Sequence, residues 1–398
     1  MPLRPATASP TAAPNTEPEK KPLAVAPMGC TNFFNPRLNT WFSVCGLILD
    51  KYNQLGGPGG FMGPPTSNEI TNPDGIGKRS SFENDASIYW SPSSGAHQIG
   101  GAIGAEWAAQ QWESGPLGYP TTDEIINSDG VGRHNHFQGG SIYWSPTTDA
   151  HTVWGAIRDK WETEGWELSV LGYPVTNEFA TVTGGFGQHF QSGSIYWSAS
   201  TGTHYVLNRI KSLWSAANWE NGVYGYPTED TRNVGCNENA QNFQGGILVT
   251  NIDAYKLGHS AVDGREIAYS ADWTKQSSSD AWAGAVNDWN ALGSINIKES
   301  GIFGFDVTTN EVNLPDVDYS GQYTYYPVLS DQIVLNIAYT DSYTPTQRKV
   351  VLTHELGHAL GLDHSCKSQI MSESDAERLA STTEPNKLDT AVYRYLWG

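Results

Sequence analysis

Apolar and aromatic positions recur in the same order along residues 30–252, with a period of about 54 residues. Each copy contains a stretch with apolar residues at helical spacing, which predicts amphipathic helices at residues 102–112, 156–166 and 210–219. Each copy also alternates around an Ile-Tyr-Trp sequence, which predicts hairpin strands at residues 87–90, 141–144 and 194–197. We therefore expect an α+β array of about four helix–turn–hairpin units that pack against one another.

A Gly-Tyr-Pro turn, or a variant of it, joins each predicted helix to its hairpin. The four copies of this turn begin at Met62, Leu117, Leu171 and Tyr224. Tyrosines and tryptophans alternate along the strands, so we expect one set in the core and the other at the surface or against a neighbouring unit. A sugar-stacking surface is the alternative role for these rings. A histidine that recurs at the repeat period is expected to form a hydrogen bond within each copy, at His97, His151 and His204.

Past residue 251 the turns stop and the pattern changes. Residues 265–270 are predicted as a strand, and residues 280–292 as a long helix that places Trp282 and Trp289 on one apolar side. Further strands are predicted at residues 302–307 and 332–339. Another helix is expected to begin after Thr344, because Thr-Pro-Thr-Gln forms a capping box with a proline in the first turn.

The last of these helices carries the most specific motif in the chain. His354, Glu355, His358, Gly361 and His364 fit the pattern H-E-x-x-H-x-x-G-x-x-H. Residues four apart share one face of a helix, so His354 and His358 are predicted to bind one Zn²⁺ ion. A turn at Gly361 would let His364 reach the same ion, since glycine tolerates a sharp turn best. Glu355 is then the expected general base for a water in the remaining position.

Residues 255–398 resemble the catalytic domain of a metzincin zinc endopeptidase, and Ser365 after the third histidine makes them most similar to the matrixins. This resemblance implies a zincin-like α/β domain with a five-stranded sheet, a long helix, the active-site helix and a C-terminal helix. It also implies that an edge strand pairs with the substrate backbone. By position, the resemblance makes His354, His358 and His364 the zinc ligands, Glu355 the base, Met371 the methionine turn and Gly361 the support of the site.

The repeats resemble the LGFP repeat, with tyrosine in place of phenylalanine in the turn. That family occurs in secreted and cell-wall proteins of actinobacteria, so the resemblance implies a role in binding the wall or a glycan. The first copy, with Met62-Gly-Pro-Pro, departs most from the pattern, as terminal repeats often do.

An acidic, turn-rich segment lies between the later predicted strands, with Asp306, Glu311, Asp316, Asp318 and Asp331. Matrixins commonly hold calcium in such loops, so a structural Ca²⁺ site is one interpretation. A solvated surface is the other, because the spacing matches no strict calcium loop. A second zinc is not expected, because residues 302–348 contain no histidine.

Four cysteines, Cys30, Cys45, Cys236 and Cys366, allow three pairings. For an exported protein we favour disulfides between Cys30 and Cys45 and between Cys236 and Cys366. The second would fasten the end of the repeats beside the predicted zinc site. The alternative is that the Cys236 thiolate caps the zinc as a latency switch, although the sequence around it lacks the Cys-Gly-Val-Pro-like context.

Composition and charge exclude some classes of partner and a membrane-spanning segment. The net charge of −19 argues against nucleic acid and anionic membranes. There is also no apolar run of about 18 residues, so we expect no membrane span. Residues 1–29 are rich in Pro, Ala and Thr and are predicted to be a disordered tail.

The sequence thus predicts three parts: a tail (1–29), a repeat domain (30–252) and a zinc protease domain (253–398). We expect a secreted endopeptidase that cleaves protein or peptide substrates, with repeats that target it to the cell wall or a glycan surface. The alternative is a cell-wall-binding structural protein with only autoproteolytic activity or none.

Overall fold

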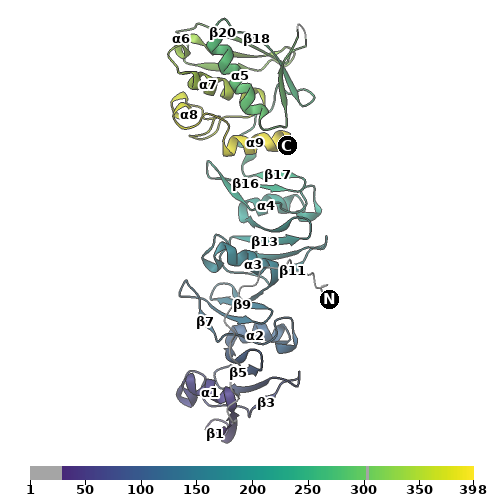
Figure 1. Ribbon diagram of the computed structural model, residues 1–398, viewed down its shortest axis with the longest axis vertical. Helices are drawn as coiled ribbons and strands as arrows, with labels where there is room; N and C mark the ends of the chain where they lie inside the picture. The colour runs from purple at the N-terminus through teal and green to yellow at the C-terminus, as the bar shows by residue number, and fades with distance from the viewer. Residues whose placement is uncertain (1–28, 302–303) are drawn as a thin grey trace, which may run out of the picture. The chain divides into compact units, whose positions relative to one another are not determined.

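The computed structural model describes residues 29–301 and 304–398, and these residues form nine α-helices and 22 β-strands (Figure 1). They fall into two compact units, one of residues up to Gly101 together with Tyr119–Thr121, and one of the remaining residues. The predicted tail at residues 1–29 lies outside the described residues, apart from Gly29. Within the described part of the chain, no helix is both long enough and apolar enough to cross a membrane.

The first unit contains a disulfide-closed hairpin and a four-stranded antiparallel sheet. Cys30 and Cys45 are paired in register at one end of the hairpin and form a disulfide, with their Cα atoms 4.0 Å apart, which confirms the predicted bridge. The sheet has the order β3-β4-β5-β6. The elements are β1 (Cys30–Asn35), β2 (Thr40–Cys45), α1 (Gly46–Gln54), β3 (Ile70–Thr71), β4 (Lys78–Phe82), β5 (Ala86–Ser91) and β6 (Gly95–Gly100).

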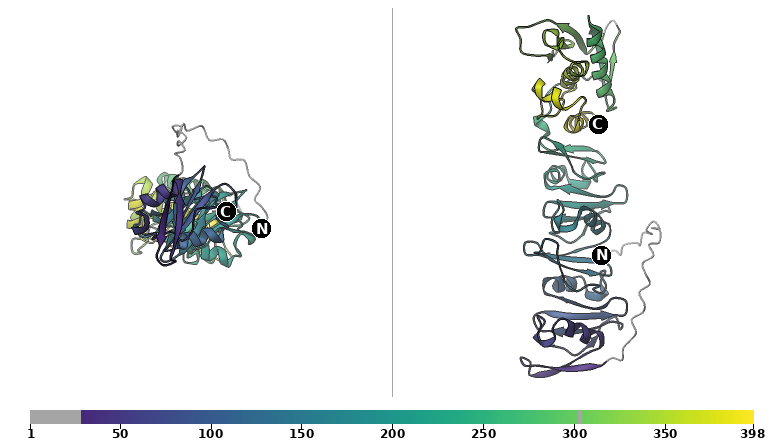
Figure 2. Two further views of the ribbon diagram at one scale, coloured as in Figure 1. Left: turned by 90° about the horizontal axis from the view of Figure 1, so that it is seen from below. Right: turned by 60° about the vertical axis from the view of Figure 1, so that its left-hand side comes forward.

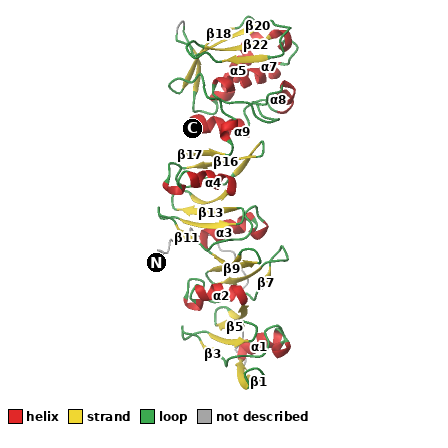
Figure 3. Ribbon diagram, turned by 180° about the vertical axis from the view of Figure 1, so that it is seen from behind, coloured by secondary structure: helices red, strands yellow, loops and turns green. Residues whose placement is uncertain are grey.

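Sheets and helices alternate along residues 122–254, as Figures 2 and 3 show from two sides. The strands are β7 (Ile125–Ile126), β8 (Arg133–Phe137), β9 (Gly140–Ser145), β10 (Asp149–Val153), β11 (Phe179–Ala180), β12 (Phe186–Phe190), β13 (Gly193–Ser198), β14 (Gly202–Leu207), β15 (Arg232–Gly235), β16 (Glu238–Phe243) and β17 (Gly246–Val249). They form two four-stranded sheets and a final three-stranded one. The repeats are therefore richer in strands than the predicted helix–turn–hairpin unit, because each sheet has one or two strands beyond a hairpin.

The repeat helices are α2 (Gly101–Ala109), α3 (Gly155–Glu164) and α4 (Asn208–Ala216), and each ends before the tryptophan that closed its predicted range. In the middle copy Gly165 has a left-handed φ of 103°, which ends α3 and starts a short 3₁₀ helix at Trp166. The change of chain direction at Gly165 packs Trp166 edge-on against Trp161 of α3, with ring centroids 5.2 Å apart. The predicted helices were too long because the apolar spacing continues through this turn.

The Ile-Tyr-Trp strands place tyrosine in the core and tryptophan at its margin. Tyr143 is 3 % exposed, whereas the neighbouring Trp144 is partly exposed. The recurring histidines form the predicted bond within each copy, since Nε2 of His97, His151 and His204 lies 2.8–2.9 Å from the carbonyl oxygen three residues earlier. Both predictions are confirmed.

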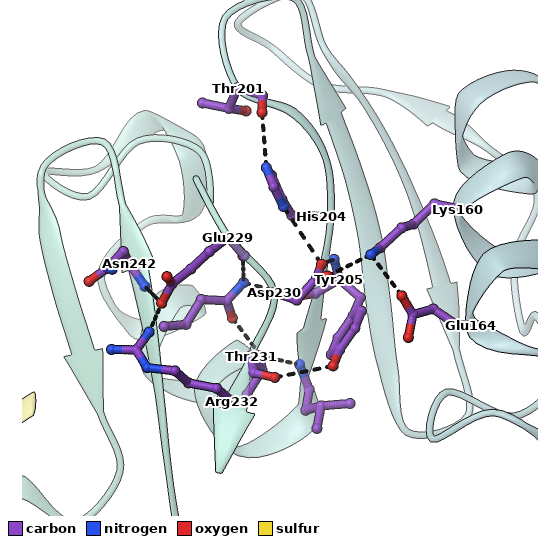
Figure 4. Close-up of polar contacts among 12 residues, drawn as sticks. Lys160, Glu164, Thr201, His204, Tyr205, Glu229, Asp230, Thr231, Arg232 and Asn242 are labelled. Atoms are coloured by element: carbon purple, nitrogen blue, oxygen red, sulfur yellow. Dashed lines mark hydrogen bonds and ion pairs between the residues drawn. The ribbon is translucent and has the colours of Figure 1, made fainter. Parts of the chain in front are cut away.

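Polar side chains join successive repeats. Lys160 of α3 lies 2.5 Å from Asp230 and 2.7 Å from Glu164, and Asp230 also accepts a hydrogen bond from the Tyr205 amide (Figure 4). One copy earlier, Glu106 of α2 accepts hydrogen bonds from Thr152 and Asn177, both at 2.8 Å. Such partly buried polar groups help to fix how one repeat packs on the next, because each needs its partner.

The tyrosine of the Gly-Tyr-Pro turn forms a second joint. The Tyr173 hydroxyl donates to Asp129 at 2.6 Å and accepts from Asn127 at 2.9 Å, both in the loop of the preceding copy. We therefore expect Tyr173→Phe to lower the free energy of unfolding by about 1–3 kcal/mol, because Asp129 and Asn127 lose a buried partner. Urea unfolding measures this loss. The control is Tyr224→Phe, whose hydroxyl makes no hydrogen bond within the described residues, and equal losses in the two variants would contradict the prediction.

The C-terminal region contains a five-stranded sheet with the order β19-β18-β20-β22-β21, in which only β21 is antiparallel to its neighbour. Helices α5 and α7 pack together on one face of the sheet (Figures 1 and 3). The strands are β18 (Glu266–Asp272), β19 (Asn296–Glu299), β20 (Val307–Val312), β21 (Gly321–Thr324) and β22 (Asp331–Asn336). The helices are α5 (Gln276–Asn290), α6 (Ile337–Thr340), α7 (Pro345–Ala359), α8 (Asp375–Ser381) and α9 (Lys387–Trp397).

Two of the predicted strands in this region need correction. The strand predicted at residues 302–307 begins only at Val307; Gly304 has a φ of 80°, and residues 302–303 lie outside the described part. The strand predicted at 332–339 ends at Asn336, whose side chain accepts from the Ala338 amide and caps α6. A side-chain cap thus ended the strand where the apolar alternation continued.

The last repeat sheet and the C-terminal region share one hydrophobic core. Val234 and Val249 of that sheet cluster with Leu388 and Tyr393 of α9, all at most 1 % exposed. Helix α9 thus packs on the three-stranded sheet. The domain boundary near residue 252 stays a prediction, and the apolar packing continues across it.

Candidate metal centre and active-site cleft

Helix α7 holds two histidines with their ring nitrogens aimed at one point. The helix begins with the predicted capping box between Thr344 and Gln347, and Pro345 lies in its first turn. One turn apart, His354 and His358 each direct Nδ1 to a backbone carbonyl oxygen, of Ile370 and Leu362, at 2.8 Å. A carbonyl only accepts, so Nδ1 carries the proton and Nε2 has a free lone pair in both rings.

The third histidine arrives by the predicted turn. Gly361 has a φ of 89°, and a Cβ there would lie 3.3 Å from the His259 carbonyl oxygen. The ring of His364 then packs against both helical histidines, with centroids 5.3 Å from His354 and 4.9 Å from His358. Among the described residues, these three histidines form the group able to hold a metal ion, with ligand atoms within 4.8 Å of one another.

The donor set fits zinc. The Nε2 atoms of His354 and His358 are 3.1 Å apart, and two lone pairs at this distance repel unless a cation lies between them. Burial lowers the pKa of His358 to about 4 and lowers that of His354, so both rings are neutral, which is the metal-binding form. Three imidazoles are a known catalytic zinc set that leaves one position open.

Glu355 lines a cleft of about 450 Å³. The residue is 3 % exposed, and this burial raises the pKa of its carboxyl to about 7. The three histidines, residues 318–323 and part of residues 373–378 complete the lining. A buried carboxylate beside the imidazoles of the three histidines can accept a proton from a water that enters the cleft.

Strand β21 borders the cleft and is the outer strand of its sheet. It pairs with β22 alone, and a Cβ on Gly321 would lie 2.9 Å from the Glu355 side chain. An outer strand beside a buried carboxylate is where an extended peptide can add by backbone hydrogen bonds.

Met371 packs against Gly357 of α7, and a carboxylate that the sequence analysis missed holds its backbone. A Cβ on Gly357 would lie 2.4 Å from the Met371 sulfur, so this residue of α7 must be glycine. Asp389 of α9 accepts hydrogen bonds from the Ile370 amide at 2.8 Å and the Met371 amide at 3.3 Å. An aspartate among the apolar positions of a C-terminal amphipathic helix was the signal that could have revealed it.

We expect Asp389→Ala to lower the free energy of unfolding by about 3 kcal/mol or more, because buried amides lose their acceptor. Asp389→Asn should cost less, since one oxygen remains. Burial raises the pKa of Asp389 to about 6, so unfolding is best compared at pH 8, where the group is ionised. The exposed Asp316→Ala serves as the control; an Asp389→Ala protein as stable as this control would contradict the role.

The second predicted disulfide joins the last repeat sheet to the site. Cys236 and Cys366 are bonded, with Cα atoms 5.5 Å apart, so the alternative in which the Cys236 thiolate caps the zinc is wrong. Cys366 lies two residues beyond His364. The turn at Cys236 is thereby fixed to the loop that carries the third histidine.

The acidic residues considered for calcium do not converge in the described chain. Asp306 accepts from the Ala268 amide at 2.7 Å, and Asp331 accepts from the Tyr326 amide and the Tyr323 hydroxyl. Glu311 accepts from Thr274, and Asp318 lines the cleft. This arrangement therefore gives no support for a calcium site at these residues.

Comparison with protein families agrees with both parts of the chain. Residues 243–398 match the matrixin family, and residues 62–115, 117–169 and 171–222 each match the LGFP repeat. The fourth turn, from Tyr224, lies outside the repeat matches, and no curated protein matches the chain. The chain therefore carries three LGFP repeats followed by a matrixin domain at its C-terminus.

Proposed function

We propose that the chain is a secreted zinc endopeptidase in which His354, His358 and His364 hold the metal and Glu355 is the general base. The matrixin match supports a zinc metalloprotease. The observation that carries the proposal is the pair of Nε2 lone pairs 3.1 Å apart, whose Nδ1 atoms are fixed by carbonyl oxygens. This geometry favours metal binding, because a metal-binding histidine typically donates its other ring N–H group to a carbonyl or carboxylate oxygen.

A bound zinc ion would polarise the scissile carbonyl and lower the pKa of a water molecule. In this proposal the residues of the chain do the remaining work. Strand β21 pairs with the substrate backbone and holds the peptide extended along the cleft. Glu355 accepts the proton of the attacking water and delivers it to the leaving amine. Because this carboxylate is buried, it acts in a medium of low dielectric constant, where its effect on charge is large.

Metal removal tests the proposal. We expect a chelator to abolish hydrolysis of a casein-like substrate and of internally quenched peptides, and added Zn²⁺ to restore it. Cleavage should occur at internal bonds, as mass spectrometry of the products will show. Hydrolysis that persists in the metal-free protein would refute the proposal.

We also propose that the repeats hold the enzyme at a cell wall or glycan surface. Partly exposed tryptophans recur along the repeat strands, at Trp90, Trp144 and Trp197, and exposed rings suit stacking on sugars. Two disulfides favour an oxidising, extracellular location. The full chain with Glu355→Gln, which cannot degrade itself by the proposed route, should sediment with purified actinobacterial cell wall. Failure to sediment would contradict the tethering proposal and would leave the peptidase proposal unaffected.

A further inference from the structure

A hollow of about 280 Å³ lies in the middle repeat, away from the residues of the proposed peptidase. The turn between β8 and β9 and the start of α3 form its lining. Three residues of the lining, His136, Arg158 and Asp159, carry side chains that can be charged. The arrangement of these groups indicates which kind of ligand the hollow suits.

Arg158 is fixed by its neighbours and has one amino group left over. Its Nε donates to Ser141 Oγ at 3.1 Å, and its guanidinium carbon lies 5.1 Å from the centre of the Trp166 ring. Its Nη1 lies 3.5 Å from Glu162 and 3.8 Å from Asp159. Within the described residues Nη2 has no partner, and it is not one of the atoms buried without one. Two N–H donors of Nη2 are therefore available to a ligand.

His136 supplies a second donor at the same hollow. Ser141 is fully buried, and its hydroxyl accepts from Arg158 and lies 2.8 Å from Nδ1 of His136. The hydroxyl proton has no other acceptor in the described part of the chain, so it goes to Nδ1 and the ring proton lies on Nε2. Burial lowers the pKa of His136, which keeps the ring neutral. The Nε2–H group is thus the free donor of this imidazole.

The next repeat contains the same arrangement. His189, Ser194 and Lys211 each follow their counterparts by 53 residues. Nδ1 of His189 lies 2.8 Å from Ser194 Oγ and 3.2 Å from Lys211 Nζ. An ammonium group can only donate, so Nδ1 accepts and Nε2 again carries the proton. The other two copies have Ser81 and Asn242 in place of the imidazole, so the arrangement is specific to these two repeats.

The charges around the two cations favour a negatively charged ligand. Asp159 and Glu162, the carboxylates beside Arg158, are replaced by Ser212 and Ser215 in the next repeat. Lys211 forms no ion pair with a carboxylate within the described residues, and burial lowers its pKa. A partly buried cation without a counter-ion is unfavourable, and an oxyanion relieves it through charge-assisted hydrogen bonds.

The net charge of −19 does not decide binding at these two points. Interactions between exposed charges are screened beyond about 8 Å at physiological ionic strength, so the groups beside the ligand dominate. A continuous polyanion would meet Asp159 and Glu162 as well as Arg158. The sites therefore suit a single oxyanion group rather than a dense row of charges.

We propose that His136 with Arg158, and His189 with Lys211, each bind a single oxyanion group, carboxylate or phosphate, of the surface polymer to which the repeats are proposed to tether the enzyme. One oxygen of the group would accept from the cation and another from the Nε2–H group of the histidine. The inference rests on the proposed tethering, because it names the ligand group that the repeats recognise.

Nuclear magnetic resonance of the imidazole nitrogens tests the proposal on the full chain with Glu355→Gln. The probes are two matched pairs, methyl glucuronide with methyl glucoside and glycerol phosphate with glycerol, which differ in the acidic group. We expect an acidic probe to shift the Nε2 signals of His136 and His189 and to bind at least about tenfold more tightly than its neutral partner. The acidic probe that binds identifies the source of the oxyanion as carboxylate or phosphate. Equal shifts with neutral and acidic probes, or no shift with either acid, would overturn the proposal.

Two variants test the cations, and each leaves the other site as its matched control. Arg158→Gln should weaken acid binding at His136 at least about tenfold and leave His189 unchanged, because one charge-assisted hydrogen bond is lost. Lys211→Gln should have the reverse effect. The unchanged signal of the other histidine reports that the chain is folded. Unchanged affinity at the altered site in both variants would contradict the assignment.

A third variant distinguishes an acidic ligand from a neutral polar one. Asp159→Ser reproduces the residue that the next repeat has at this position, and the Asp159 side chain is 74 % exposed, so the fold should be unaffected. Removing this carboxylate should raise the affinity of the acidic probe at His136 by about two- to fivefold, the range of an exposed ion pair. A fall in affinity would show that the ligand needs an acceptor from the protein, and would overturn the oxyanion assignment.

Sedimentation with cell wall separates this inference from the tethering proposal. The double variant Arg158→Gln, Lys211→Gln should sediment less than the parent chain, and Lys298→Gln with Arg394→Gln, two exposed residues outside the repeats, is the control. If acidic probes bind but the parent chain does not sediment, only the tethering proposal fails. If the parent and the double variant sediment equally, only the oxyanion inference fails.

Discussion

Replacement of Glu355 by glutamine is expected to reduce kcat/KM for peptide hydrolysis by about 10²–10⁴-fold, the range that a positioned general base contributes. Glutamine has nearly the same shape, so it keeps the packing, but its carboxamide cannot take up the proton of the attacking water. The three histidines are unchanged, and zinc content measured by atomic absorption should equal that of the native protein. The effect therefore isolates proton transfer from metal binding.

The control for this variant is Glu384→Gln, which makes the same chemical change at an exposed residue outside the cleft lining. Its kcat/KM should match the native value. A Glu355→Gln protein that binds zinc and still cleaves peptides at the native rate would require another base, and none of the other carboxylates that line the cleft is buried.

Loss of the Cys236–Cys366 disulfide is expected to have the second-largest effect. Its sequence separation is 130 residues, and a cross-link over a loop of this size stabilises the folded state by about 4–5 kcal/mol in the chain-entropy model. Replacing both cysteines by serine should therefore lower the free energy of unfolding by several kcal/mol. It should also lower kcat/KM, because Cys366 holds the loop that carries His364.

The second disulfide of the chain supplies the matched control. Replacing Cys30 and Cys45 by serine removes a bridge with a separation of 15 residues, for which the same model gives about 3 kcal/mol. This pair should reduce stability but leave kcat/KM unchanged, since it closes a hairpin in the other unit. If both pairs affect only stability, the bridge at Cys366 does not position the site.

Local sequence patterns predicted much of the candidate metal site. The capping box at Thr344, the helical spacing of His354 and His358 and the turn at Gly361 are all short-range features, and the structure contains each of them. Both disulfides were also predicted, although cysteine count alone left three pairings open. The roles of the site residues remain proposals until they are tested by substitution.

Long-range features were outside the reach of sequence patterns. The carboxylate of Asp389 in α9 accepts hydrogen bonds from the Ile370 and Met371 amides, and sequence patterns do not reveal which distant amides a buried carboxylate will meet. Strand β21 was not predicted, because it is short and its apolar content is low, and its place at the sheet edge depends on β22. Ser320 and Arg378 line the same cleft although 58 residues separate them in the sequence.

The sequence by itself determined the repeat period, the families, the helix that carries the metal-binding pattern and the residues that can donate to zinc. These follow from the chemistry of neighbouring residues, which acts over one or two turns. Only the tertiary structure decided where β20 begins, why β22 gives way to α6, and that α9 closes the last repeat sheet within a shared core. Those outcomes depend on which distant groups compete for the same hydrogen bonds and apolar surfaces, and such competition is settled only when the chain packs.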